Sequence, residues 1–563
     1  MNWLTIVLAA VCLNGPWQFK FEEDKPLEAA GGAAFVADDV MSVPGCWDVL
    51  PRYYLKHGTG LYRRAFTLDA PMKDAVLVVE GMGLRASFAV DGVAKGGVQS
   101  YPYARLEIPV GPLAAGAHEI FAAVDNIQEW PRVKLARPYY DFYFYGGFYH
   151  GVKLVEKAPK VFVRTRDYAT GTVEVQVEGP VPAGAMLTID GRPVAAEWKD
   201  GRAVVKVPGF RLWSPEAPNL HALAVTLPGD AAQPDAVTFG IRQVEAKAGK
   251  IFLNGRPLFL KGFNRHESSM LEGSATGDAT MLRDIQNLKA VGGNFLRGAH
   301  YQQSERFLDL CDRAGVLVWE ESLGWGNGQG YTSRHDKLSE PDDAEFCDMQ
   351  ERQTREMVRA SFNHPSVIIY GFLNECASDK PVVKALVDRL AATIRKEDSG
   401  RLVTFACNMI DKDISCESVD LVSINAYPGT IPMTPGRPEE LKRQVEKRFD
   451  SAIERFLKLY PEKPLIVSES GCGAVPGARD PLNASPSTED FQDEYLRDIL
   501  TCLWANPHCS GYAIWQMNDG RTRERFWQKA CSVMFGGSVA GCFDEMRRPK
   551  KSVATVKSFF EKK

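Results

Sequence analysis

Residues 366–375 have the sequence Ser-Val-Ile-Ile-Tyr-Gly-Phe-Leu-Asn-Glu, an apolar run of strand length that ends in a carboxylate. A second segment, Leu465-Ile-Val-Ser-Glu469, has the same form. Continuous apolar runs are typical of parallel strands that are buried on both faces. A charged carboxylate at the end of such a run is costly to bury, so its presence there indicates a functional role. The two segments therefore predict parallel strands that each present a functional acid.

Similar segments recur through the C-terminal half of the chain. From about residue 246, apolar runs alternate with helical periodicity, as in the predicted helix capped by Asp278 and stopped by Gly292-Gly293. Eight strands with intervening helices over about 300 residues predict a (β/α)8 TIM barrel, here residues 246–563. The predicted strands are Leu258–Gly262, Asn294–Arg297, Val316–Glu320, Val367–Leu373, Leu402–Ala406, Leu421–Asn425, Leu465–Ser468 and Tyr512–Trp515.

The N-terminal part of the chain is β-rich instead. In residues 1–156, short alternating runs are separated by turn signals such as Asp91-Gly92, and no amphipathic helix is evident. This pattern predicts a jelly-roll β-sandwich. Residues 157–245 are strand-like and rich in turns, and their length suits an immunoglobulin-like sandwich. This segment contains no cysteine, so the prediction includes no disulfide.

The overall composition excludes several classes of protein. The 563 residues are 45% hydrophobic and 25% charged, which is ordinary for a globular protein rather than a disordered or fibrous one. The net charge is −4 and neither sign is concentrated in blocks, so we expect no nucleic-acid partner. The 12 cysteines form no Cys-x-x-Cys pair, and we expect them to be small buried hydrophobes rather than redox or zinc residues.

The longest apolar run is Trp3–Leu13, and it is too short to span a membrane, which needs roughly 20 residues. We interpret residues 1–13 as a signal-peptide remnant, although no Lys or Arg precedes the run. A periplasmic or secreted location is therefore favoured over a cytoplasmic one. The alternatives are that this segment forms a first strand or that the start of the sequence is misassigned.

The spacing of the two strand-end acids suggests how they act. Glu375 and Glu469 lie 94 residues apart, close to three βα units of roughly 30 residues. That spacing assigns them to strands 4 and 7 of the barrel. In such barrels the chemistry takes place at the carboxyl ends of the strands. Two carboxylates that face each other across a site are what glycoside hydrolysis requires.

The segment from Asn363 to Glu375 resembles the acid/base signature of glycoside hydrolase family 2, which includes β-galactosidases, β-glucuronidases and β-mannosidases. Further motifs that resemble this family occur in order along nearly the whole chain: Leu13-Asn-Gly-Pro-Trp17, Val43-Pro-Gly-Cys-Trp47, Gly60-Leu-Tyr-Arg-Arg64, Gly146-Gly-Phe-Tyr149, Leu212-Trp-Ser-Pro215, Gly262-Phe-Asn-Arg-His-Glu267, Arg297-Gly-Ala-His-Tyr301, Val318-Trp-Glu-Glu321 and Arg548-Pro-Lys-Lys551.

The resemblance implies a role for each matching residue. Glu375 is expected to be the general acid/base and Glu469 the nucleophile of a retaining mechanism. The remaining site residues are expected to bind substrate or to support the acids: Asn374 on the sugar 2-hydroxyl, Arg297 as a cation and Tyr427 as a hydrogen-bond donor near Glu469, Trp515 as a platform under the sugar, and His266 and His300 on hydroxyls. His364 is interpreted as structural, and Glu320 and Glu321 as part of a scaffold ion pair.

Two departures from the family pattern affect the predicted activity. Residues 322–325 lack the Glu-x-His metal pair of some family β-galactosidases, so we expect no catalytic metal and no cofactor. Family β-glucuronidases carry an Asn-x-Lys for the substrate carboxylate, whereas this chain has Gly537-Ser-Val-Ala540 there. Arg521, Arg523 or Lys529 are the candidate replacements. Neutral sugars are therefore expected, and β-galactosides come first among them only because they are frequent in the family.

The sequence leaves three alternatives open. The first is an exo-acting retaining β-glycosidase of β-galactosidase type. The second is another specificity of the same family, namely β-glucuronidase, β-mannosidase, galactofuranosidase or arabinosidase. The third is a catalytically silent carbohydrate-binding protein, which the presence of both Glu375 and Glu469 argues against. A carbohydrate substrate is expected in every case, and the resemblance implies a homo-oligomer.

Overall fold

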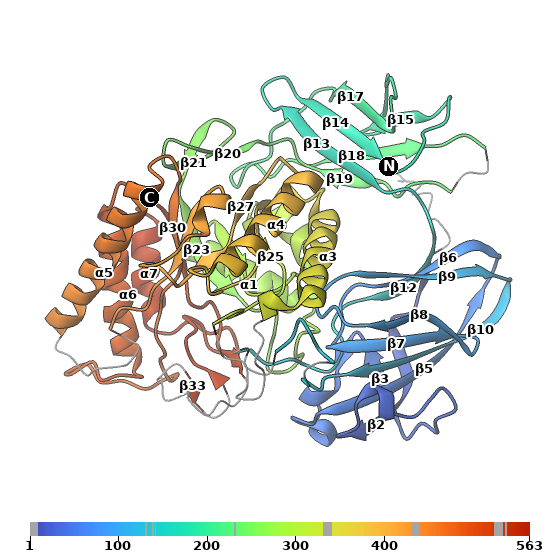
Figure 1. Ribbon diagram of the computed structural model, residues 1–563, viewed down its shortest axis with the longest axis horizontal. Helices are drawn as coiled ribbons and strands as arrows, with labels where there is room; N and C mark the ends of the chain where they lie inside the picture. The colour runs from blue at the N-terminus through green and yellow to red at the C-terminus, as the bar shows by residue number, and fades with distance from the viewer. Residues whose placement is uncertain are drawn as a thin grey trace.

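The computed structural model describes residues 10–129, 132–137, 140, 142–229, 232–329, 340–429, 438–522, 533–534 and 537–562. A parallel barrel surrounded by helices forms one side of the molecule, and two β-rich units lie on the other side (Figure 1). Within the described residues, no helix combines the length and apolar character needed to cross a bilayer.

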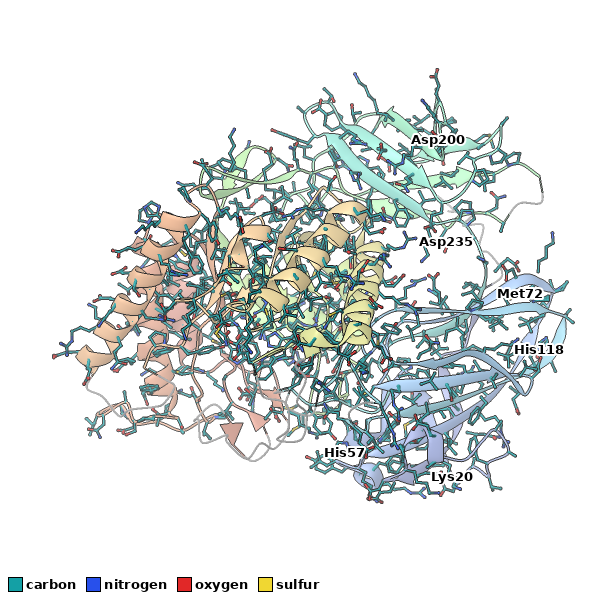
Figure 2. All side chains as sticks on the ribbon, in the orientation of Figure 1. Lys20, His57, Met72, His118, Asp200 and Asp235 are labelled. Atoms are coloured by element: carbon teal, nitrogen blue, oxygen red, sulfur yellow. The ribbon has the colours of Figure 1, made fainter. Side chains whose placement is uncertain are left out.

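The N-terminal unit is a sandwich of two antiparallel sheets. Its core contains large aromatic side chains, including Trp17, Trp47 and Phe148. Figure 2 shows Lys20 and His118 at its outer edge. One sheet has the order β1 (Val11–Cys12), β12 (Val152–Glu156), β6 (Met72–Val79) and β9 (Leu106–Leu113). The other has the order β3 (Asp39–Val43), β2 (Gly15–Glu23), β5 (Gly58–Leu68), β10 (Gly116–Asp125), β7 (Arg85–Val90) and β8 (Val93–Gln99), and β4 (Gly45–Cys46) pairs with β11 (Gly147–Phe148).

The end of the predicted signal segment belongs to this sandwich. Val11 and Cys12 pair with Leu154 and Lys153 of β12, and Leu13 is buried in the core. The indole nitrogen of Trp17 donates to the carbonyl oxygen of Leu13 at 2.8 Å. Residues 1–9 lie outside the described residues, so the signal-peptide prediction remains a prediction.

The second β-rich unit packs a three-stranded sheet on a four-stranded sheet, as in an immunoglobulin-like sandwich. Alternate residues of its strands enter the core, which is the pattern of a strand with one buried face. The sheets are β13 (Val161–Asp167), β14 (Thr172–Val177) and β17 (Arg202–Lys206), and β16 (Arg192–Val194), β15 (Met186–Ile189), β18 (His221–Thr226) and β19 (Val237–Phe239).

The C-terminal unit is a TIM barrel of parallel strands, as predicted. Strand 5 is interrupted at Phe405, so the barrel sheet contains nine segments. In chain order they are β23 (Leu260–Arg265), β24 (Phe295–Gly298), β25 (Leu317–Glu321), β26 (Val367–Gly371), β27 (Leu402–Thr404), β28 (Ala406–Cys407), β29 (Val422–Asn425), β30 (Leu465–Glu469) and β31 (Cys509–Ile514). The first predicted strand began too early, because Leu258 belongs to a separate antiparallel ribbon.

That ribbon closes the amino-terminal end of the barrel. It consists of β20 (Val244–Lys247), β21 (Lys250–Leu253) and β22 (Arg256–Leu258), and its apolar residues join the inner core of the barrel. The indole of Trp319 fills the interior so closely that a Cβ at Gly371 would lie 2.0 Å from its Nε1. Glycine is therefore required at residue 371 by close packing.

The helices of the barrel are α1 (Asp278–Ala290), α2 (Glu305–Ala314), α3 (Ala344–Ser361), α4 (Pro381–Glu397), α5 (Pro438–Leu459), α6 (Glu489–Ala505) and α7 (Ser552–Phe560). The side chains of Ser304, Asp343 and Thr488 cap α2, α3 and α6. The predicted cap of α1 was wrong. Asp278 is the first helical residue, the cap position is Gly277, and the Asp278 carboxylate pairs with Arg306 instead. A small sheet of β32 (Gly520–Arg521), β34 (Gly537–Ser538) and β33 (Val533–Met534) follows strand 8.

The N-terminal sandwich packs directly against the loops at the carboxyl end of the barrel. The rings of Tyr103 and Tyr301 stack with centroids 3.7 Å apart. Arg105 donates to both oxygens of Glu305 at 2.9 Å, and His150 lies 3.7 Å from Glu267. His150 thus lies in the packing between the two units. The domain bounds 1–156, 157–245 and 246–563 remain a prediction.

His364 is held at the amino-terminal face of the barrel, just before strand 4. Its Nδ1 lies 2.6 Å from Oδ2 of Asp312, whose Oδ1 accepts a hydrogen bond from the backbone of Ser366. Burial lowers the pKa of His364, but the negative charges of Asp312, Asp309 and Glu305, Asp312 foremost, outweigh that effect, so the pKa lies above its usual value. Protonated His364 therefore stabilises the folded protein. This stabilisation is fully present below the ordinary histidine pKa of about 6.5, and it is lost as the pH rises through the higher pKa of the folded state.

Replacing Asp312 by Asn is therefore expected to destabilise the protein more at pH values near 5.5 than near 9. The amide of the variant still accepts from the backbone of Ser366, so the difference between the losses at the two pH values reports the charge on His364. The loss in the free energy of unfolding near pH 5.5 should be on the order of 1–3 kcal/mol. Thermal melting of the wild type and the variant at the two pH values measures it. Asp309→Asn is the matched control, because Asp309 is 45% exposed and lies 4.0 Å from His364. Equal losses at both pH values would contradict this account.

Candidate active site

The carboxyl ends of strands 2, 4, 6 and 7 bring the predicted acids into one hydrogen-bond network. Arg297, at the end of β24, donates from Nη1 to Oε1 of Glu469 at 2.6 Å and from Nη2 to Oδ1 of Asn374 at 2.8 Å. Asn425, the last residue of β29, donates to Oδ1 of Asn374 at 3.1 Å and to Oε1 of Glu375 at 3.0 Å. Glu375 and Glu469 are therefore joined by one hydrogen-bond network, and their catalytic roles remain a prediction.

Each carboxylate oxygen of Glu469 accepts a short hydrogen bond. Arg297 occupies Oε1, and the hydroxyl of Tyr427 donates to Oε2 at 2.7 Å. Charge-assisted hydrogen bonds of this kind stabilise the ionised form of a carboxylate. Glu469 itself is 3% exposed. The arrangement thus holds a charged, oriented carboxylate at the end of strand 7.

Glu375 is placed by a tight turn that follows strand 4. Leu373 and Glu375 both have left-handed backbone conformations, with φ values of 50° and 51°. Such conformations cost of order 1–3 kcal/mol each in residues other than glycine, and they cluster at functional sites. The backbone nitrogen of Glu375 donates to the carbonyl of Ala406 at 2.8 Å, which fixes the turn against strand 5. The side chain is partly exposed, unlike that of Glu469.

Asn374 carries an unused donor within this network. Its Oδ1 accepts from Arg297 and Asn425, whereas its Nδ2 is buried and has no hydrogen-bond partner among the described residues. A buried donor without a partner costs roughly 1–3 kcal/mol, so a bound group that accepts from it is stabilised. The amide is therefore suited to donate to a hydroxyl oxygen of a bound sugar.

His266, His300 and Trp515 form an aromatic group beside the acids. The rings of His300 and Trp515 stack with centroids 5.2 Å apart, and His266 meets Trp515 edge-on at 5.4 Å. His300 also joins the network, with its Nδ1 3.3 Å from Nη2 of Arg297. Because arginine only donates, Nδ1 accepts and Nε2 carries the proton of the neutral ring. The structure thus places every predicted site residue at one end of the barrel.

The electrostatics of the site follow from burial. Burial lowers the pKa of His300 to about 3 despite the opposing charge of Glu469, and it lowers the pKa of His266 well below its usual value. Both imidazoles are therefore neutral hydrogen-bonding groups at ordinary pH. Burial also lowers the pKa of Arg297, but Glu321 and Glu469 outweigh it, so the pKa lies above its usual value. The charge on Arg297 is permanent.

The two acids at the end of strand 3 are scaffold residues. Arg297 donates to both oxygens of Glu321, at 2.8 and 3.0 Å, which confirms the predicted ion pair. Glu320 accepts from the backbone of Gln303, and burial raises its pKa well above the usual value. Among the described residues no cation lies within ion-pair distance of Glu320, so the predicted ion pair was wrong for this residue.

The candidate cations for a substrate carboxylate lie after strand 8. The guanidinium of Arg521 lies over the rings of Tyr54, Tyr143 and Tyr145, between 4.8 and 5.5 Å from their centroids. Its Nη1 donates to the carbonyl of Asp48 at 3.2 Å. Arg523 and Lys529 lie outside the described residues.

Three residues at the site were missed by the sequence reasoning. Asn425 ends a barrel strand and Asn264 interrupts one, and the strand-end rule that selected the acids does not select an amide, because the rule rests on the cost of burying a carboxylate. Asn264 accepts from Arg297 at 3.0 Å. Phe142 of the sandwich packs against His266 and His300, with centroids 5.4 and 5.9 Å apart. No signal in the sequence indicates that a residue so distant reaches the barrel.

Comparison with known proteins identifies the family. A model described as the TIM barrel domain of glycosyl hydrolases family 2 matches residues 244–562. The chain belongs to glycoside hydrolase family 2. The resemblance inferred from the motifs is thereby confirmed, and the family 2 enzyme is a β-glycoside hydrolase with a carbohydrate substrate.

Several relatives of this family 2 enzyme are similar over much of its length. It is 26% identical to a β-glucuronidase of Streptococcus agalactiae serotype V, across 97% of this chain and 95% of that protein. A β-glucuronidase of Paenibacillus borealis is 27% identical across 75% of this chain and 70% of its own. The solved structure of a family 2 β-galacturonidase from Eisenbergiella tayi has a TM-score of 0.85 and 26% identity, covering 100% of this chain and 98% of that one.

Proposed function

We propose that this enzyme removes a terminal β-linked hexuronic acid from a glycoside by retaining double displacement. The observation that carries the chemistry is the network that joins Glu375 and Glu469 through Arg297, Asn374 and Asn425. The uronic acid is supported by the relatives, which are named β-glucuronidases and a β-galacturonidase.

In the first step, Glu375 donates a proton to the glycosidic oxygen while Glu469 attacks the anomeric carbon. The aglycone leaves, and a covalent ester joins the sugar to Glu469. In the second step, Glu375 removes a proton from water, which attacks the anomeric carbon and releases the ester. Arg297 and Tyr427 hold Glu469 in its charged form for the first step, and they stabilise it again as it leaves in the second.

Asn374 and Trp515 are proposed to bind the sugar during both steps. The free Nδ2 of Asn374 donates to the 2-hydroxyl, where hydrogen bonds strengthen in the transition state. Trp515 provides an apolar face, backed by the stacked ring of His300. His266 and His300 supply neutral donors and acceptors to the hydroxyls.

The relatives do not support the expectation that a galactoside is the preferred substrate. They favour the alternative, β-glucuronidase or another uronidase, although this chain lacks the Asn-x-Lys of family β-glucuronidases. That one departure is the observation that keeps a neutral β-galactoside as the second candidate. A uronidase without the lysine must satisfy the substrate carboxylate with different donors, since an unpaired buried charge is very costly.

A panel of 4-nitrophenyl β-glycosides is expected to show hydrolysis of the glucuronide or galacturonide with kcat/KM at least about 100-fold above that of the corresponding neutral sugar. A site built for a carboxylate leaves its donors unpaired when the neutral sugar binds, so it rejects that sugar strongly. The panel includes the glucuronide, galacturonide, glucoside, galactoside, mannoside, galactofuranoside and arabinoside. A preference for the galactoside over both uronides would replace the proposal by the second candidate.

A further inference from the structure

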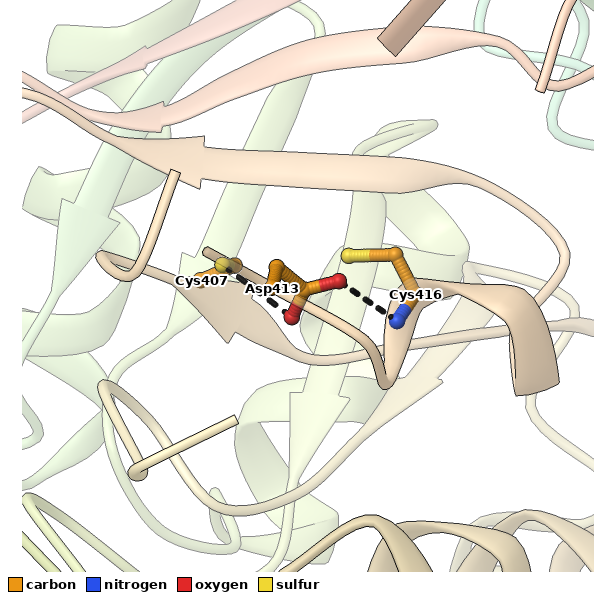
Figure 3. Close-up of side chains that lie close together, drawn as sticks. All are labelled: Cys407, Asp413 and Cys416. Carbon is orange, nitrogen blue, oxygen red and sulfur yellow. Dashed lines mark hydrogen bonds between the residues drawn. The ribbon is translucent and has the colours of Figure 1, made fainter. Parts of the chain in front are cut away.

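Three buried side chains that can ligate metal lie together beyond the end of strand 5. Cys407 ends β28, and Asp413 and Cys416 lie on the loop that follows it. Their ligand atoms all lie within 4.8 Å of one another. Figure 3 shows the sulfur atoms of Cys407 and Cys416 on either side of the Asp413 carboxylate. The side chains are 0%, 3% and 0% exposed, so the group belongs to the interior.

We propose that Cys407, Asp413 and Cys416 form a structural site for a borderline-soft divalent ion of the Zn²⁺ type, separate from the catalytic acids. The mixture of two sulfurs and one carboxylate oxygen matches the ligands that Zn²⁺ takes in proteins. Hard ions such as Mg²⁺ and Ca²⁺ prefer oxygen ligands alone. The chemistry of the donors therefore selects the class of ion.

The distance between one sulfur and the carboxylate oxygen fits a tetrahedral ion. Zn–S and Zn–O bonds of about 2.3 and 2.0 Å imply a sulfur-to-oxygen edge of about 3.5 Å. Sγ of Cys407 lies 3.5 Å from Oδ2 of Asp413. The hydroxyl of Ser378 also lies 3.5 Å from Sγ of Cys407, which makes it the candidate for the fourth, neutral position. All three ligand atoms lie within 4.8 Å of one another, so shifts of about 1 Å close the site around an ion.

The carboxylate is oriented by the backbone before any ion binds. Oδ1 of Asp413 accepts from the backbone nitrogens of Ser415 at 3.1 Å and Cys416 at 2.9 Å. These bonds leave Oδ2 directed at the sulfur of Cys407. Binding replaces the two thiol protons by the ion, so two protons leave the protein for each ion bound.

Two cations lie close enough to compensate the charge of the ion-bound site. Two thiolates, one carboxylate and a divalent ion carry one net negative charge. Lys463 donates to the carbonyl of Cys416 at 2.8 Å, and Arg455 donates to that of Asp413 at 3.4 Å. Within the described part of the chain, neither cation has a carboxylate within ion-pair distance, 4.0 Å. Their positive charge is available to compensate the buried cluster.

The site lies behind the loop that carries the proposed acid/base. The hydroxyl of Ser415 donates to the carbonyl of Ser378 at 2.9 Å, and the backbone of Glu375 donates to Ala406, the residue before Cys407. An ion here would tie the loop after strand 5 to the loop after strand 4. We therefore expect the ion to raise the thermal stability of the barrel rather than to take part in the reaction.

The test compares the full chain with three variants, each produced in zinc-supplemented medium. Cys407→Ser with Cys416→Ser removes both sulfurs. Asp413→Asn keeps the acceptor for the two backbone nitrogens and removes only the charged ligand. The control is Cys347→Ser with Cys502→Ser, because these half-buried cysteines lie elsewhere. Zinc content is measured by mass spectrometry after gel filtration, and the thiolate-to-Cd²⁺ charge-transfer absorption is measured on protein refolded with Cd²⁺.

The wild type and the control are expected to carry about one ion per chain and to show the Cd²⁺ band, with a melting temperature that falls when a chelator is present. The double cysteine variant and Asp413→Asn are expected to lose at least about tenfold in metal affinity. A wild type that carries no zinc and shows no Cd²⁺ band would overturn the proposal. So would a folded Asp413→Asn with wild-type metal content, a result that does not depend on the cysteine variant folding.

Discussion

Replacing Glu469 by Gln is expected to reduce kcat/KM by on the order of 10⁴- to 10⁶-fold, the scale seen when the nucleophile of a catalytic unit is removed. An amide has neither the charge nor the basicity needed to form the glycosyl ester. The variant keeps an oxygen for Arg297 and a polar group for Tyr427, so the hydrogen-bond geometry at the end of strand 7 is retained. The melting temperature is therefore expected to change far less than the rate.

Steady-state kinetics on the best uronide of the substrate panel measures this loss. Glu454→Gln is the matched control, because Glu454 is exposed on α5 and undergoes the same chemical change. An activated 2-deoxy-2-fluoro uronide gives a second readout, since it is expected to label the peptide that contains Glu469 in the wild type. A folded Glu469→Gln variant with activity within tenfold of the wild type would remove Glu469 from the mechanism.

Replacing Glu375 by Ala is expected to affect substrates according to their leaving groups. For an alkyl glycoside the loss in kcat/KM should be about 10²- to 10⁴-fold, the usual contribution of a general acid. For a dinitrophenyl glycoside the loss should be much smaller, because that phenolate leaves without a proton. The difference arises because Glu375 acts on the departing oxygen and not on the sugar.

Azide separates the two roles of Glu375. As an anion it attacks the glycosyl ester without needing a base, so it should restore turnover of the dinitrophenyl substrate and yield the β-glycosyl azide. The azide product from the variant, analysed by NMR, also reports retention of configuration. Equal losses for both leaving groups, or no response to azide, would count against the acid/base role. Glu454→Ala serves as the control for truncation of a glutamate.

Much of the barrel could be predicted because its strands are recorded locally in the sequence. Parallel strands buried on both faces require continuous apolar runs, and each of the eight runs corresponds to a barrel strand. Errors of up to a few residues occurred where local pattern is ambiguous. Leu258 was wrongly included in the first strand, because it is an apolar residue of the ribbon that closes the barrel. Trp515 was wrongly included in the eighth strand, because it is an apolar residue whose ring stacks on His300 beyond the strand end.

The acids could be predicted for a similar reason, since a carboxylate after an apolar run is unusual by itself. Their partners were harder to assign. Tyr427 and Arg297 were selected from strand ends, but Asn425, which contacts both Asn374 and Glu375, was not. An amide at a strand end is common, and only its two hydrogen bonds distinguish it from any other.

Taken alone, the sequence determined the class of each folding unit, because strand periodicity depends on neighbours in the chain. Its ordered motifs indicated the family by resemblance, and the polar ends of two apolar runs predicted the two acids. Tertiary structure alone decided which distant groups meet, such as Phe142 with the barrel histidines, and Arg297 with both Glu321 and Glu469. It also decided that the loop after strand 5 folds so that Cys407, Asp413 and Cys416 meet. Such contacts depend on how strands and loops close in space, and the residues involved have no periodic relation along the chain.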